Sequence, residues 1–275
     1  MRRRAFIAGL GAVASWPVVV KATGDASPVI GFLYGTSYRK AQFLWAAFLE
    51  GLASLGYVEG QNLRIELREA EGHYERLPGL AADLVKLQPA LLVGAAAPAA
   101  LALKAATTTI PLVFTASDDP VKLGFVASLR RPGGNATGIN PMMIALEGKR
   151  LSLLHELIPD AVRIGVLFNP NSPDALAHFT DIEASGQSLG LDLVIIKVAE
   201  KAGFENAFAR LEEQQIRALL VAEDPIFLPE DIAPLAVQFK VAVAQGSPAF
   251  AGAVMSYGPI LTDTYRQLGV YSGRF

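Results

Sequence analysis

Short apolar runs alternate with segments of helical spacing from residue 29 onward, and this alternation constrains the fold more than any other feature. The apolar runs that we expect to be strands are residues 29–33, 63–69, 90–94, 112–114, 163–168, 191–198, 218–221 and 241–244. Strand–helix alternation is typical of right-handed crossovers and parallel sheets. The pattern starts again after Pro141, so we expect two α/β lobes that face each other across a cleft, which hinge motion can close.

The stretch 112–140 places polar side chains at the ends of two expected strands. The first strand runs into Ser117, Asp118 and Asp119, and after a short expected helix and an Arg-Pro-Gly-Gly turn the second strand ends at Asn140. Parallel strands open on the same rim of a sheet, and that rim is where such sheets bind ligands. Hydroxyl, carboxylate and carboxamide groups at this rim suit a small polar molecule. Residues 63–69 instead alternate apolar and charged side chains, which predicts a strand near a sheet edge.

Composition and motifs exclude several classes of function. The 275-residue chain has a formal net charge of −2, so no global basic field attracts nucleic acid or an anionic membrane. It has no cysteine, which excludes disulfides and thiolate chemistry but says little about its compartment. Its 3 histidines, His73, His155 and His178, lack the spacing of a metal site. The sequence also lacks a nucleophile elbow and a phosphate-binding loop, so we expect neither an enzyme nor a bound cofactor.

The first residues indicate export. Residues 2–4 are all arginine and precede an apolar run, rich in glycine and alanine, that extends to residue 20. Small residues around Ala22 then offer a cleavage site, as in a secretory leader. Residues 3–7 resemble a twin-arginine signal, while the general secretory route stays open. A membrane anchor is disfavoured because the run is short. We therefore expect residues 1–27 to be an export signal and the mature protein to be periplasmic.

Seven segments of the chain carry a specific pattern over long ordered spacings. They are IGFLYGTS (30–37), GLASLGYVEGQNLRIE (51–66), RLPGLAADLV (76–85), IPLVFTASDDPVKLGFVASLRRPGGNATG (110–138), KRLSLLHELIP (149–159), RIGVLFNPNSP (163–173) and VMSYGP (254–259). This pattern resembles the family of ABC-transporter substrate-binding proteins related to tryptophan-binding proteins. The resemblance covers nearly the whole chain after the leader. It implies a type I periplasmic binding protein fold, with two Rossmann-like lobes joined by a hinge, and delivery of a solute to a membrane permease.

The same resemblance implies the limits of the lobes. We expect lobe 1 to comprise residues 28–140, with residues 254–275 returning to it, and lobe 2 to comprise residues 141–247. The hinge is expected near residues 139–142 and 246–254. Residues 246–253 (GSPAFAGA) are apolar where relatives tend to be charged. The sequence stops inside a helix expected to begin near residue 262, whereas relatives continue, so we expect a truncated C-terminus, uncovered apolar surface and reduced stability.

The ligand contacts of the family fall on the loops that follow the strands. They would be Thr36, Ser37, Ala97, Ser117 and Asp119 in the first wall, Asn140 at the crossover, and Asn169, Asn171, Ser172 and Asp224 in the second wall, with Tyr38 and Tyr257 as pocket aromatics. Hydroxyls and backbone N–H groups can receive a carboxylate, and Asp224 can take an ammonium. The resemblance therefore implies a monomer that captures an amino acid or a related small carboxylate.

Other interpretations of the same residues stay open. Ser172 or Asp174 can cap the following helix, and Asp119 with Pro120 can begin another. A ligand sensor of the same fold that serves no transporter, or a non-functional truncated member, fits the same pattern. The effector domain of a transcriptional repressor shares the architecture, but residues 1–28 supply no helix-turn-helix.

Overall fold

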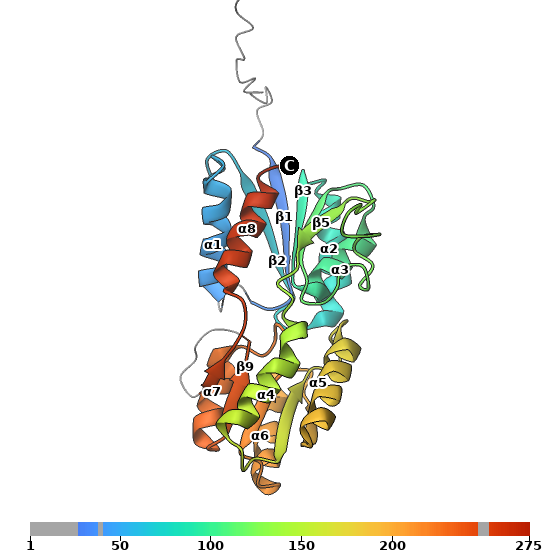
Figure 1. Ribbon diagram of the computed structural model, residues 1–275. Coiled ribbons are helices and arrows are strands. Elements are labelled where there is room, and N and C mark those ends of the chain that lie inside the picture. Colours follow the sequence, from blue (N-terminus) through green and yellow to red (C-terminus); the bar gives the residue numbers. More distant parts are fainter. Residues whose placement is uncertain (1–26, 38–40, 247–252) are drawn as a thin grey trace, which may run out of the picture.

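The computed structural model describes residues 27–37, 41–246 and 253–275, and these form two α/β lobes stacked end to end (Figure 1). Lobe 1 has a parallel sheet in the order β2-β1-β3-β4-β5. Its strands are β1 (Val29–Tyr34), β2 (Arg64–Glu69), β3 (Leu91–Ala95), β4 (Leu112–Thr115) and β5 (Ala136–Ile139). One face of the sheet is covered by α1 (Gln42–Ala53) and α8 (Leu261–Ser272), and the other by η2 (Tyr74–Arg76), α2 (Leu77–Lys86) and α3 (Ala97–Ala106).

Lobe 2 repeats this architecture with a parallel sheet in the order β10-β9-β8-β6-β7. Its strands are β6 (Arg163–Phe168), β7 (Asp192–Lys197), β8 (Ala218–Val221), β9 (Ala242–Gln245) and β10 (Ala253–Ser256). One face packs against α4 (Glu147–Leu157) and α5 (Ala175–Leu189), and the other against α6 (Phe204–Glu213) and α7 (Pro229–Gln238). Two short helices, η3 (Ile144–Leu146) and η4 (Lys201–Gly203), directly precede α4 and α6. The prediction of two α/β lobes with parallel sheets is confirmed.

Burial explains why the strands were recognisable in the sequence. Every residue of β3 and of β8 is buried, because helices cover both faces of these central strands, and so both strands are continuously apolar. Strand β2 lies at the edge of its sheet, and its charged side chains are only partly covered. The alternating pattern of residues 63–69 therefore predicted an edge strand correctly.

One predicted element is wrong. The short helix expected after Pro120 is a series of turns, in which the Phe125 N–H donates to the Pro120 carbonyl and the Phe125 ring stacks on Phe114. The helix expected to begin near residue 262 is present as α8. Within the described ranges no helix is long and apolar enough to cross a membrane.

The chain passes between the lobes where polar residues were expected to mark a hinge. Asn140 lies at the first passage, where its side chain donates to the Asp118 carbonyl and accepts from the Met142 N–H. On the return, β10 pairs in parallel with β9, so residues 253–256 belong to the sheet of lobe 2 and only the chain beyond them returns to lobe 1. The expected assignment of residues 254–256 to lobe 1 is therefore corrected. The expected leader, apart from residue 27, and hinge residues 247–252 lie outside the described residues.

Candidate functional site

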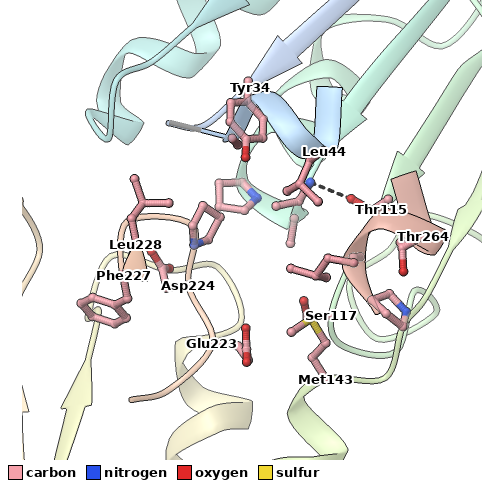
Figure 2. Close-up of a pocket in the computed structure, with 18 of the residues that line it drawn as sticks. Tyr34, Leu44, Thr115, Ser117, Met143, Glu223, Asp224, Phe227, Leu228 and Thr264 are labelled. Carbon is pink, nitrogen blue, oxygen red and sulfur yellow. Dashed lines mark hydrogen bonds between the residues drawn. The ribbon is translucent and has the colours of Figure 1, made fainter. Parts of the chain in front are cut away.

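A cavity of about 280 Å³ lies between the lobes, at the carboxyl ends of strands from both sheets (Figure 2). Lobe 1 contributes Thr115 at the end of β4, Ser117 after it and the first residue of α3. Lobe 2 contributes Glu223 and Asp224 after β8. Aromatic and aliphatic side chains complete the lining, among them Tyr34, Phe43, Leu44, Phe227, Leu228 and Leu261. The cavity therefore combines a few polar groups with a largely apolar wall, as small-molecule sites do.

The lobe 1 wall presents the N-terminus of α3 to this cavity. Ala96 adopts a positive φ of 69°, and its N–H donates to the Thr115 hydroxyl oxygen at 2.8 Å. Helix α3 can start close to β3 because Gly94 has no side chain. A Cβ at this position would lie only 2.5 Å from the Cα of Ala100. The N–H groups of the first helical turn have no acceptor within the helix, and Ala97 lines the cavity. This wall can therefore receive an anionic group of a ligand.

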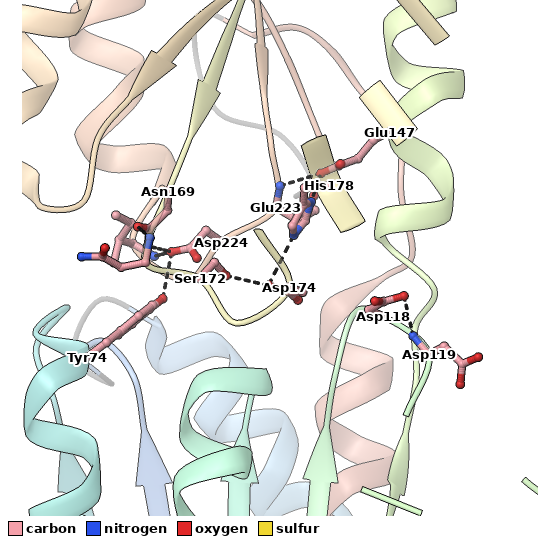
Figure 3. A network of polar contacts seen from close by, with 12 residues as sticks. Tyr74, Asp118, Asp119, Glu147, Asn169, Ser172, Asp174, His178, Glu223 and Asp224 are labelled. Carbon is pink, nitrogen blue, oxygen red and sulfur yellow. Dashed lines mark hydrogen bonds and ion pairs between the residues drawn. The ribbon is translucent and has the colours of Figure 1, made fainter. Parts of the chain in front are cut away.

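The lobe 2 wall carries the Asp224 carboxylate. Its Oδ1 accepts hydrogen bonds from the Tyr74 hydroxyl at 2.8 Å, from Asn169 Nδ2 at 3.1 Å and from the Ile226 N–H at 3.1 Å (Figure 3). Its Oδ2 is buried and has no hydrogen-bond partner among the described residues. Burial raises the pKa of Asp224 above its ordinary value, against these hydrogen bonds. The carboxylate is thus held by one oxygen, while the other is left for a donor that a ligand would bring.

A buried network of charges supports this wall from within lobe 2. His178 Nδ1 lies 2.7 Å from Glu147 Oε1, and His178 Nε2 lies 3.6 Å from Asp174 Oδ1. Although burial alone would lower it, the contacts with Asp174 and Glu147 raise the pKa of His178 to about 10. His178 is therefore a cation at neutral pH. Burial would raise the pKa of Asp174, but the interaction with His178 keeps it below its ordinary value.

Arg150 extends this network to the cavity and to the returning chain. The side chain is completely buried, and its Nε donates to the Tyr257 carbonyl at 2.7 Å. Its Nη2 lies 3.4 Å from Glu223 Oε1, and its Nη1 lies 4.0 Å from Glu147 Oε1. Burial raises the pKa of Glu223 to about 7, although the charge of Arg150 opposes the shift. The network therefore connects the cavity carboxylate of Glu223 with the segment that returns to lobe 1.

The structure brings some of the expected ligand contacts together. Ala97 and Ser117 line the cavity from lobe 1, and Ser172 and Asp224 line it from lobe 2. Asn169 is buried behind them and acts through its hydrogen bond to Asp224. Side chains from two sheets that are far apart in sequence thus meet at one cavity.

Other expected contacts lie elsewhere. Asp119 stabilises a turn outside the cavity, since its Oδ1 accepts from the Val121 N–H at 2.8 Å, and none of the described residues between it and β5 forms a helix for it to cap. Asn171 is exposed. Tyr257 is 43% exposed, and its backbone is engaged: the N–H donates to the Gln245 carbonyl and the carbonyl accepts from Arg150. Asn140 binds backbone groups at the passage between the lobes.

Thr36 and Ser37 line a separate cavity of about 380 Å³, with His73 and Glu200. Tyr38 lies outside the described residues.

Sequence reasoning missed Tyr74, Glu223 and the buried network. Glu223 directly precedes Asp224 after an apolar strand, so the pair was visible as two neighbouring acids on one loop. Asp174 and His178 are spaced i,i+4, a signal that was also available. Tyr74 offered no signal, because its partner Asp224 lies 150 residues away in the chain.

Known proteins share both the fold and the sequence pattern of this chain. The two-lobed fold with a central cleft is that of type I periplasmic binding proteins. The family model for "ABC transporter substrate binding protein" matches residues 37–275, and the chain belongs to this family. The resemblance seen in the sequence is therefore confirmed. Members of the family are extracytoplasmic ligand-binding components of ABC transporters rather than enzymes.

Individual relatives share this fold. A tyrosine-binding protein of Clostridioides difficile is 26% identical over 207 residues, which cover 74% of this chain and 57% of that protein, so the match spans less than two thirds of the relative. A conserved domain protein of Vibrio cholerae has a TM-score of 0.78 at 28% identity, over 90% of this chain and 83% of that one. A Streptococcus pneumonia ABC domain in complex with L-Trp has a TM-score of 0.75 at 23% identity, with the same coverage.

Proposed function

We propose that this protein is the exported solute-binding component of an ABC importer, which captures an amino acid between its lobes and delivers it to a membrane permease. The observation that carries the proposal is the buried, unpartnered Oδ2 of Asp224 at the cavity wall. A buried acceptor without a donor costs free energy, and a ligand ammonium would supply the donor. A charge-assisted hydrogen bond of this kind contributes about 1.5–3 kcal/mol.

The opposite wall suits the carboxylate of the same ligand. The first turn of α3 offers backbone N–H groups, and Ser117 adds a hydroxyl at the same rim. The two ionic groups of an amino acid would therefore contact different lobes. A ligand that contacts both lobes favours the arrangement in which the lobes are close, because only that arrangement allows both sets of contacts.

The apolar lining indicates which side chain the amino acid carries. Phe43 and Leu44 come from lobe 1 and Phe227 and Leu228 from lobe 2, and all four line the cavity. Such a wall favours an aromatic or large aliphatic side chain by burying its apolar surface. The C. difficile relative is named a tyrosine-binding protein, so aromatic amino acids are the first candidates.

The proposal includes the cellular location and the oligomeric state of the protein. Export through the N-terminal leader, by the twin-arginine or the general secretory route, would place the mature protein in the periplasm as a monomer. Asn140 and the residues near 246–254 would act as the hinge.

Isothermal titration and thermal melting of the purified protein with the standard amino acids test the proposal. At about 100 times its Kd, a bound amino acid should add roughly 2.7 kcal/mol to the free energy of unfolding. Asp224→Asn should abolish the shift, while Asp119→Asn, an equal change at a turn residue outside the cavity, should keep it. A folded protein that binds none of these amino acids would contradict the proposal.

A further inference from the structure

The described residues that line the cavity carry charges of one sign. Four carboxylates line it, those of Asp174, Glu223, Asp224 and Glu230. Among the described lining residues there is no lysine, arginine or histidine. From these residues a ligand anion would meet only backbone N–H groups and hydroxyls as partners, while a ligand cation would meet carboxylates.

The buried network behind this lining does not neutralise it. Arg150 and His178 are the cations, and they face the carboxylates of Glu147, Asp174 and Glu223. Above about pH 7, where Glu223 is ionised, three carboxylates against two cations leave one negative charge uncompensated. Asp224 adds a second, because no ion pair among the described residues reaches it. Uncompensated buried charge is costly, and this cost is reflected in the pKa of Glu223, which burial raises to about 7.

Glu223 is held in place at the cavity. Its backbone N–H donates to Glu147 Oε1 at 2.8 Å, and its carboxylate pairs with Arg150, which is itself fixed by the Tyr257 carbonyl. On the other side the backbone closes in, since a Cβ at Gly246 would lie 1.7 Å from Glu223 Oε1. The Glu223 side chain is 16% exposed and faces the cavity near Ser117 and Met143 (Figure 2). These contacts hold the Glu223 carboxylate at the cavity wall.

We propose that Glu223 is a specificity-determining residue through which the cleft selects its ligand by charge, accepting amine-bearing molecules and rejecting anions that lack an amine. This inference rests on the proposed function and deepens it, because it assigns the discrimination against simple carboxylates to the charge of one residue. The ammonium of an amine offsets the excess negative charge, which Asp224 and Glu223 share. An anion without an amine adds a third uncompensated charge and loses affinity accordingly.

Matched sets of small molecules test the inference. One set is L-phenylalanine, 2-phenylethylamine and 3-phenylpropionate, and the other is L-leucine, 3-methylbutylamine and 4-methylpentanoate. Within each set the apolar body is similar and the charged groups differ. In calorimetric titrations of the unmodified protein, the carboxylate without an amine should bind at least 100-fold more weakly than the tightest amine-bearing member. Equal or tighter binding of that carboxylate would overturn the inference and leave the proposed function standing.

Variants assign the selection to Glu223. Glu223→Gln keeps the size and removes the charge, so the ratio of affinities within each set should shrink at least tenfold. Glu223→Asp keeps the charge and should preserve the ratio, as should Glu183→Gln, an equal change at an exposed position of α5. An unchanged ratio in folded Glu223→Gln protein would overturn the assignment. If Glu223→Gln does not fold, Gly246→Ala, whose Cβ displaces the Glu223 carboxylate, should shrink the ratio in its place, and an unchanged ratio would overturn the assignment. Failure of both sets and of all standard amino acids to bind would instead refute the proposed function.

Discussion

The hydroxyl of Tyr74 donates a hydrogen bond of 2.8 Å to Asp224 Oδ1, from η2 in lobe 1 to the loop after β8 in lobe 2 (Figure 3). This bond links the two lobes directly at the cavity. It also sets the orientation of the carboxylate, because Oδ1 is engaged and Oδ2 is left unpartnered. Burial raises the pKa of Tyr74 well above its ordinary value, and the charge of Asp224 adds to the effect, so the hydroxyl remains a donor.

Tyr74→Phe should therefore weaken amino-acid binding. Loss of a hydrogen bond to a charged group costs about 1.5–3 kcal/mol, which corresponds to about a ten- to hundredfold rise in Kd. The lobes of the ligand-free protein should also separate more, which X-ray scattering would detect as a larger radius of gyration. Tyr271→Phe, at an exposed tyrosine on α8, is the matched control. Unchanged affinity and scattering would show that the bond does not hold the lobes together.

His178 should make the protein less stable as the pH rises. Its folded pKa of about 10 exceeds the unfolded value near 6.5, so the folded protein binds the proton more tightly. This contribution is fully present below about pH 6.5 and is lost as the pH rises through about 10. His178→Gln should cost about 3–5 kcal/mol at pH 6.5, because it leaves Glu147 and Asp174 without their cation, and should flatten the pH dependence.

Urea unfolding between pH 6.5 and 9.5 measures this effect. His73→Gln, at an exposed histidine, should retain both the stability and the slope of the unmodified protein. A slope that persists in His178→Gln would assign the pH dependence to other groups.

The sequence predicted most of the fold because local patterns determined it. Continuous apolar runs such as β3 and β8 occur where a strand is covered on both faces, and this pattern is visible in each run by itself. The helix predicted after Pro120 failed because the conformation there depends on a tertiary contact. The turns after Pro120 are held by stacking of Phe125 on Phe114, a contact that no periodicity reveals.

The site was less predictable than the fold for a related reason. Asp224 was predicted because it follows an apolar strand, but its neighbour Glu223 acquires a role only through Arg150, which comes from α4. Glu147 and Arg150 lie in a helix where charged residues would ordinarily face solvent, yet both are completely buried. Only the packing of α4 under the loop after β8 makes them part of the site.

The contact between α1 and α8 should tolerate no added side-chain atom at its two glycines. A Cβ at Gly51 would lie 2.0 Å from the Arg266 carbonyl oxygen, and one at Gly269 would lie 2.1 Å from the Phe48 carbonyl oxygen. Gly51→Ala or Gly269→Ala should therefore cost about 1–3 kcal/mol by overpacking, as measured by urea unfolding. Gly79→Ala is the control, because nothing lies within 4 Å of its Cβ, and it should instead stabilise α2 by about 0.5–1 kcal/mol. Equal effects of all three substitutions would contradict close helix packing.

Gly246→Ala should disturb the cavity through Glu223. The new Cβ would lie 1.7 Å from Glu223 Oε1 and 2.4 Å from Arg150 Nη2, so the carboxylate and the guanidinium would have to move apart or shift together. Either movement displaces Glu223 from its place at the cavity, and we expect affinity for an amine-bearing ligand to fall about tenfold. A double-mutant cycle separates this effect from general destabilisation: in the Glu223→Gln background, Gly246→Ala should change ligand affinity little, because the displaced charge is already absent. Additive losses in the two backgrounds would mean that Gly246 acts on the cavity by another route, such as the path of the chain between β9 and β10.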